Sequence, residues 1–324
     1  MQCRMKHELP SFAFSKREIR SLRVIVDNQN VSIHDISSKL GKSEGPVSRT
    51  IKNLEKKGIV EVKRAGMRKL VAISDRNYAV SLSETIRAEP YIPWENVLSD
   101  SNLPVLFKNV VGERSFGYNI STATSWRVVR NLSRLGMNVG QHTEYLSKNR
   151  NLVRFINEYA DYVSMKYTKE EIPSNAIVLW RSGYRCLFKV RGTSLHEDKS
   201  LSDGTFPTSL TVSPYYGLKF ITEDSYYYHD TKLTKLTIED VILHTLLIDP
   251  DSQTYASYAI LLALKSIKLV DLDLLQQKAS DYQLEKIVAD FVAYIMSKGK
   301  IREWPFPDPN ELSAQTNLYG IVVN

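Results

Sequence analysis

The stretch from Ser43 to Ile73 constrains the fold of this chain more than any other, because a short amphipathic helix is followed there by a basic hairpin. Apolar residues recur at Val47, Ile51 and Leu54, four and three positions apart, which places them on one face of a helix. The opposite face carries Gly45, Ser48, Arg49, Lys52 and Lys56. One face can therefore pack on the protein while the other meets a negatively charged surface.

Start and stop signals agree with this helix and with the hairpin after it. Ser43 is expected to cap the first turn, and Gly58 to end the helix. The hairpin is predicted as a strand over 59–62, a turn over 63–66 and a returning strand over 70–73.

Two further helices are predicted ahead of this stretch. Apolar periodicity indicates one over Lys16–Asn28, and Ser32 is expected to cap another over Ile33–Leu40, with Gly41 in the turn. The order helix, helix, turn, helix, hairpin resembles winged helix-turn-helix regulators of the MarR and related types, through the segment SKLGKSEGPVSRTIKNLEKKGIV. The resemblance implies a DNA-binding domain over residues 1–80. Winged helices also serve as protein-interaction modules, so that alternative stays open.

The resemblance assigns roles within this domain. Side chains expected to reach base edges are those at the front and on the open face of the helix: Ser43, Glu44, Gly45, Ser48, Arg49 and Lys52. Arg49 is the best candidate for a bidentate guanine contact. The side chains expected to neutralise phosphates are Lys56, Lys63, Arg64, Arg68 and Lys69.

The charge distribution is consistent with this reading. Residues 1–80 hold 17 Lys and Arg against 8 Asp and Glu, a net charge of +9. The remaining residues hold 43 − 17 = 26 basic and 36 − 8 = 28 acidic residues, a net charge of −2. The positive field thus belongs to the first domain, although a charge excess also serves solubility.

A second stretch repeats the first at a distance of 78 residues, with VSRTIKNLEKKGI aligned on SWRVVRNLSRLGM. We interpret residues 81–147 as a second, degenerate winged-helix domain with its first helix over Leu103–Val111. Segment 112–120 is short for a second helix, and no basic wing follows over 138–147. The candidate contacts are Ser125, Trp126, Arg127, Arg130 and Arg134. Its partner is DNA, a second subunit or the first module, and Trp126 either stacks on nucleic acid or packs in a core or interface.

The remaining segments are predicted from composition and periodicity. Residues 74–101 look like a strap between modules, and Asn149–Tyr167 like a long amphipathic helix that either forms a homodimer or packs on its own chain. Residues 148–324 are expected to form an α+β domain with a mixed sheet, a helical block from Thr237 and an extended, proline-rich tail. The strands are expected over 176–180, 184–190, 210–212, 217–221 and 226–228.

A second resemblance involves this C-terminal half. The segments SPYYGLKF and LTIEDVILHTLL, together with the N-terminal module, are similar to AbiEi-type antitoxins and to archaeal relatives found beside nucleotidyltransferases. In that family the winged helix binds the promoter of its own operon, and the C-terminal part opposes a toxin. The resemblance implies an autorepressor with a toxin or another protein as its partner.

No catalytic or metal-binding motif is apparent. The six histidines lack metal-ligand spacing, and there is no phosphate loop, nucleophile elbow or dinucleotide fingerprint. Asp271 and Asp273 lack the Gly-Ser element of nucleotidyltransferases, and His244 is expected in a core or interface. We therefore expect no enzyme, cofactor or metal. Without a long apolar run or a signal peptide core, we also expect a cytoplasmic protein that does not bind membranes.

These observations favour a sequence-specific double-stranded DNA-binding transcriptional regulator of α+β class, with tandem winged helices and a C-terminal partner or effector domain. An autoregulating antitoxin is one form of it. The alternatives are a plasmid or viral replication initiator, which also pairs winged helices, and an interaction scaffold whose winged helices bind protein.

Overall fold

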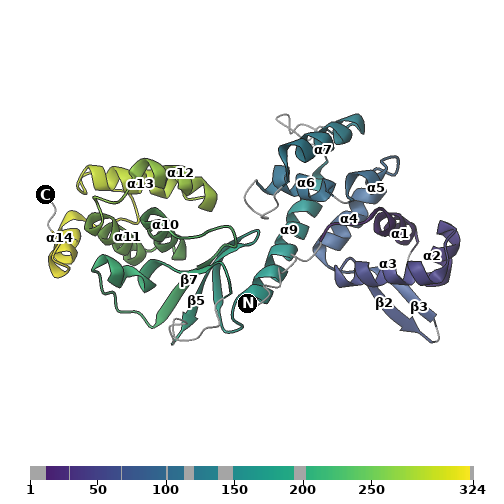
Figure 1. Cartoon of the computed structure of the whole chain (residues 1–324), viewed down its shortest axis with the longest axis horizontal. Coiled ribbons are helices and arrows are strands. Elements are labelled where there is room, and N and C mark those ends of the chain that lie inside the picture. Colours follow the sequence, from purple (N-terminus) through teal and green to yellow (C-terminus); the bar gives the residue numbers. More distant parts are fainter. Residues whose placement is uncertain are drawn as a thin grey trace, which may run out of the picture. The chain divides into compact units, whose positions relative to one another are not determined.

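The computed structural model describes residues 12–321, apart from positions 29, 67 and 100 and segments 113–119, 138–148 and 193–201. Its contacts divide the chain into two compact units, residues 1–167 and 168–324. In the part described, each unit combines several helices with a small antiparallel sheet (Figure 1). The predicted α+β class is confirmed.

Three helices open the N-terminal unit, and each follows a serine. They are α1 (Lys16–Asp27), α2 (Ile33–Leu40) and α3 (Glu44–Lys56). The hydroxyls of Ser15 and Ser32 accept hydrogen bonds from the N–H groups of Glu18 and Asp35, whose carboxylates accept from the serine N–H groups in return. Ser43 occupies the same position before α3, but its side chain makes no capping hydrogen bond, contrary to expectation.

The hairpin after α3 is longer than predicted. Strands β2 (Val60–Ala65) and β3 (Arg68–Ile73) pair antiparallel, and β1 (Val31–Ser32) adds to the other edge of β3. Lys63 lies opposite Leu70 and Arg64 opposite Lys69. The turn predicted over 63–66 is therefore wrong, because residues 63–65 belong to the strand and Gly66 turns the chain with a φ of 61°.

The segment predicted as a strap is instead largely helical. It forms α4 (Asn77–Ala88) and the short α5 (Trp94–Val97). Leu82 and Ile86 of α4 are buried, and so are its Ser81 and Thr85. Their hydroxyls bond to carbonyl groups one turn back along α4, and that of Ser81 also bonds to Glu158. Because the hydroxyls of the buried serine and threonine are hydrogen-bonded, this polar segment can form part of the core.

The remaining helices of this unit are α6 (Asn102–Val111), α7 (Thr122–Arg134) and α9 (Arg150–Glu171), of which α9 crosses the boundary between the two units. Phe155, Tyr159 and Val163 line the buried face of α9. Tyr159 stacks on Phe14 at 5.5 Å between ring centroids, and its hydroxyl donates to the carbonyl of Phe12. Of the two roles left open for this helix, the structure therefore shows packing on its own chain.

The C-terminal unit begins with a four-stranded sheet of order β4-β5-β7-β6. The strands are β4 (Ile177–Ser182), β5 (Arg185–Arg191), β6 (Thr205–Pro207) and β7 (Asp224–His229). All of these pairings are antiparallel, so the expected mixed sheet is corrected. Two predicted strands, 210–212 and 217–221, are absent; the chain there forms 3-10 turns at Ser209–Thr211 and Ser213–Tyr216 and then runs without regular structure to β7.

Five helices follow the sheet in sequence within the part described. They are α10 (Ile238–Ile248), α11 (Gln253–Lys265), α12 (Leu272–Ala279), α13 (Glu285–Met296) and α14 (Pro309–Leu318). α10 and α11 form the centre of the core, and α14 replaces the extended tail that the sequence suggested. Asp271 caps α12 through its side chain, which gives it a structural role.

The contacts do not separate residues 81–147 from the first module. The first compact unit extends to Tyr167 and includes most of α9, whereas the third domain predicted from the sequence begins at residue 148. The difference arises because α4 and α9 bury their apolar faces among the N-terminal residues.

Candidate nucleic-acid interface

The face of α3 opposite the core is open and cationic. Val47, Ile51 and Leu54 are at most 4% exposed and hold the helix on the unit. All the α3 residues predicted to contact DNA are exposed: Ser43, Glu44, Gly45, Ser48, Arg49, Lys52 and Lys56. Positions 45, 49, 52 and 56 form one ridge at three- and four-residue steps, which we call the α3 crest. A methyl group on Gly45 would meet nothing within 4 Å, so this end of the crest is low and open.

Two adjacent lysines at the C-terminal end of α3 have different surroundings. Lys56 points to solvent, whereas Lys57 bonds to both carboxylate oxygens of Glu18 at 2.9 Å and lies over the ring of Phe14. Lys57 is thereby committed to the fold. Gly58 has a φ of 70°, and a Cβ there would collide with the hydroxyl of Tyr78, so this turn requires glycine.

The hairpin adds four exposed cations, Lys63, Arg64, Arg68 and Lys69. Lys63 already has a partner, since its Nζ lies 2.6 Å from Oε1 of Glu61, and this bond raises the pKa of Lys63. No ion pair engages Arg64, Arg68 or Lys69 among the residues that the structure describes. These three are therefore free to meet phosphates.

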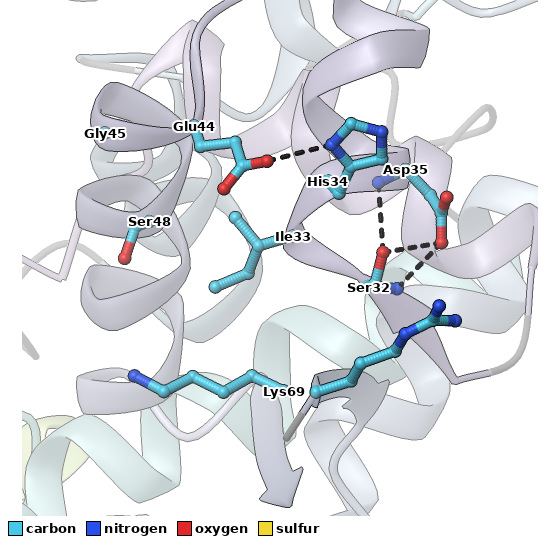
Figure 2. Close-up of a pocket in the computed structure, with 9 residues that line it drawn as sticks. Ser32, Ile33, His34, Asp35, Glu44, Gly45, Ser48 and Lys69 are labelled. Atoms are coloured by element: carbon cyan, nitrogen blue, oxygen red, sulfur yellow. Dashed lines mark hydrogen bonds and ion pairs between the residues drawn. The ribbon is translucent and has the colours of Figure 1, made fainter. Parts of the chain in front are cut away.

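A hollow of about 680 Å3 separates the α3 crest from the hairpin (Figure 2). Glu44, Gly45 and Ser48 line one side of it, and Arg68 and Lys69 the other. Figure 2 shows the carboxylate of Glu44 directed at the ring of His34, with Oε1 2.9 Å from Nδ1. The first acidic group of α3 is thus held by a neighbouring helix.

Asp35 also lines this hollow. Its carboxylate accepts hydrogen bonds from the hydroxyl and the N–H of Ser32, and these bonds lower its pKa. Asp35 therefore stays ionised near Arg68, so the hollow contains both signs of charge.

A second hollow lies on the other side of α3 and was missed by the sequence analysis. It measures about 380 Å3 and lies between α1, the turn before α3 and the side of α3 formed by Pro46 and Thr50. Arg17, Arg20 and Lys42 line it. Arg17 and Lys42 are exposed, and Arg20 lies 3.6 Å from Glu95. The sequence contained a signal for this cationic flank, because Lys42 lies in the turn that joins α2 to α3.

The α3 crest is therefore flanked by cations on both sides, from the hairpin and from α1 with the preceding turn. This arrangement suits a helix that enters a groove between two phosphate backbones. Comparison with known families agrees: a model described as winged helix-turn-helix DNA-binding matches residues 17–61. The N-terminal module is a winged helix-turn-helix DNA-binding domain. β2 and β3 form its wing.

A separate family model, named HVO_2833_C and described as C-terminal, matches residues 205–321. That range covers β6, β7 and the helices of the second unit. Comparisons with curated proteins and with solved structures gave no match.

The second predicted contact surface lies on α7. Trp126 is 63% exposed, Arg127, Arg130 and Arg134 are exposed, and Ser125 is half-buried. Ser121 caps the helix by accepting from the N–H of Thr124. The segments predicted to lack a second helix and a basic wing, 113–119 and 138–147, lie outside the described residues.

Two potentially reactive side chains of the C-terminal unit, those of His244 and Cys186, are buried. His244 is fully buried between the hydroxyls of Thr208 and Tyr282, and burial lowers its pKa to about 3. Burial also raises the pKa of the Cys186 thiol to about 12. In the described ranges, no cluster of three potential metal ligands occurs, and no helix has the length and apolarity needed to cross a membrane.

Proposed function

We propose that this protein is a sequence-specific double-stranded DNA-binding transcriptional regulator. The observation that carries the proposal is the α3 crest, whose Arg49, Lys52 and Lys56 are exposed and have no ion-pair partner in the part of the chain described. Unpaired cations on one ridge can each neutralise a phosphate of a polyanion such as DNA, and this neutralisation contributes to the free energy of binding.

In this proposal α3 enters the major groove. Arg49 lies near the middle of the crest, where its guanidinium can donate two hydrogen bonds to O6 and N7 of a guanine. The groove admits this end of the helix because Gly45 adds no side chain. Ser48 and Glu44 face the wing side and are placed to contact adjacent base edges.

The backbone contacts then come from both flanks. Arg68 and Lys69 of the wing, with Arg64 opposite Lys69 on the hairpin, neutralise phosphates on one side, and Arg17 and Lys42 do so on the other. Contacts of this kind fix the register of α3 on the duplex without reading its sequence.

For the C-terminal unit we propose a protein partner, with a toxin encoded beside this gene as the specific form. Met296, Ile301 and Trp304 are each more than half exposed within the stretch 296–304. Large exposed apolar side chains gathered within one short segment are typical of protein interaction sites. We propose no catalytic role, because His244 and Asp271 are used in packing and helix capping.

The regulator proposal is tested by the salt dependence of duplex binding. With Lys56 and the five flanking cations on phosphates, log K against log salt concentration should fall with a slope of about −5. A footprint on DNA upstream of the gene should show a protected site that binds far more tightly than random duplex. A protein-interaction scaffold would instead show weak binding with a shallow slope. A replication initiator would protect a replication origin rather than a promoter.

The partner proposal needs its own experiment. Co-expression with the product of the neighbouring gene should give a stable complex and relieve any toxicity of that product. Trp304→Ala should weaken the complex without changing DNA binding. Absence of both complex and relief would refute the antitoxin form and leave the regulator proposal standing.

A further inference from the structure

Helix α7 repeats the backbone of α3 residue by residue. Both helices contain 13 residues, and their bounds are 78 positions apart. Gly58 and Gly136 follow them with φ angles of 70° and 82°. The N–H of Ile59 bonds to the carbonyl of Leu54 at 3.0 Å, and that of Met137 to the carbonyl of Leu132 at 2.9 Å. These are the same helix-ending bonds in both copies.

The charges of the α3 crest recur at the same positions of this second helix. Arg127, Arg130 and Arg134 correspond to Arg49, Lys52 and Lys56. The two acidic residues of α3, Glu44 and Glu55, are replaced by Thr122 and Ser133. The copy therefore keeps all three cations of the crest and loses the acids beside them.

The side chains of this second crest are available for a ligand. All three arginines are exposed, and none forms an ion pair with a residue of the described ranges. The guanidinium of Arg130 lies 5.2 Å from the ring centroid of Trp126, which is 63% exposed. A large ring beside three unpaired arginines provides both an apolar and a cationic contact on one helix face.

We propose that α7 is a second binding site for duplex DNA. The inference rests on the proposed function, because the α3 crest supplies the template for it. Arg127 is placed to reach a base edge, as Arg49 is on α3, while Arg130 and Arg134 neutralise phosphates. Trp126 adds an apolar contact to sugars or thymine methyl groups.

The test uses the full chain and a 40-base-pair duplex of random sequence. The triple variant Arg127→Ala, Arg130→Ala, Arg134→Ala should bind more weakly and lose about 2 from the magnitude of its salt slope, because the phosphate contacts of Arg130 and Arg134 disappear. The matched control is Lys232→Ala, Lys235→Ala, Lys268→Ala, which removes the same charge from exposed positions of the C-terminal unit. The control should keep the wild-type slope.

A third variant separates failure of this inference from failure of the proposed function. Arg49→Ala, Lys52→Ala, Lys56→Ala removes the α3 crest. If the α7 triple variant is correctly folded and binds like wild type while the α3 triple variant loses binding, the second site is refuted and the proposed function stands. If neither triple variant changes binding, both fail.

Trp126 gives an independent readout of contact at α7. Bound duplex should shield its ring from iodide, so DNA should reduce iodide quenching of the wild-type fluorescence. The Trp126→Phe variant should lose that DNA-dependent difference, because Trp94 is fully buried, and Trp180 and the exposed Trp304 belong to the C-terminal unit, outside both proposed DNA contacts. Equal DNA-dependent protection in both proteins would place the contact elsewhere and overturn the inference.

Discussion

The α3 crest of the N-terminal unit and the start of α10 in the C-terminal unit use charge in opposite ways. In the N-terminal unit, Arg49 and Lys52 are exposed and have no ion-pair partner among the described residues. In the C-terminal unit, Asp240 is 5% exposed, bonds to Lys278 at 2.8 Å and accepts from the N–H and hydroxyl of Thr237. The cations of the α3 crest are thus left open to solvent, whereas the charge of Asp240 holds helices together, as the buried Glu18–Lys57 pair does in the N-terminal unit.

This difference predicts a separation of phenotypes. An exposed, unpaired cation contributes little to folding, so its removal should change binding alone. A buried, paired carboxylate contributes to folding because its loss leaves the partner charge uncompensated. Variants of the α3 crest should therefore be folded and defective in binding DNA, whereas variants of Asp240 should be unstable and bind DNA normally while folded.

Among the single substitutions, the largest expected effect is that of Asp240→Ala on stability. The change removes the partner of Lys278 and the capping box of α10, so it should lower the free energy of unfolding by about 3 kcal/mol. Denaturant unfolding measures this loss. Asp249→Ala, at the exposed other end of α10, is the control and should change stability by less than about 0.5 kcal/mol. Equal effects of the two would remove the contrast between buried and exposed carboxylates.

Arg49→Ala should have the next largest effect, and on binding alone. We expect a loss of about 2 kcal/mol on the cognate duplex and a relaxed preference at one base pair, because a bidentate base contact disappears. Titration against cognate duplexes that differ at each position measures both. Its unfolding curve should match that of wild type. Equal losses on cognate and random duplex would show that Arg49 meets a phosphate and does not read a base.

The sequence predicted the first module well because local signals there agree with the packing. The Ser32 capping box and the left-handed Gly41 set the ends of α2 at Ile33–Leu40, as expected. The step pattern of Val47, Ile51 and Leu54 identified the buried face of α3, and thereby the exposed one. When a helix buries one face and exposes the other, the spacing of its apolar residues identifies both faces from the sequence alone.

Other segments were predicted wrongly because their burial depends on residues far along the chain. The middle of α4 alternates polar and apolar residues, and its Ser81 is buried through a bond to Glu158, which is 77 positions away. Lys56 and Lys57 are equivalent in sequence, yet only Lys57 meets Glu18. The cations of the second hollow were missed for the same reason, since α1 and the turn before α3 meet only in the fold.

The buried His244 should make the stability of the C-terminal unit depend on pH. Its pKa is lowered from 6.5 to about 3, so below pH 6.5 the unfolded chain binds a proton that the folded chain does not. Stability is fully present above pH 6.5 and should fall by about 1.4 kcal/mol per pH unit as the pH drops toward 3. Burial lowers the pKa of His229 too, so the measurement is the difference in slope between wild type and His244→Gln. Identical slopes would mean that His244 becomes charged in the fold.

The smallest expected effect tests the same contrast within the wing. Lys63 and Arg64 are adjacent and exposed, but Lys63 is paired with Glu61 while Arg64 is unpaired in the described structure. Arg64→Ala should weaken binding to all duplexes by less than about 1 kcal/mol and reduce the magnitude of the salt slope by about 1. Removing the pair with Glu61→Ala and Lys63→Ala together should leave the slope unchanged, because the net charge and the number of free cations stay the same. A slope reduced as much as by Arg64→Ala would show that Lys63 leaves Glu61 for a phosphate. An ion pair in the free protein would then not prevent a cation from contacting a phosphate in the complex.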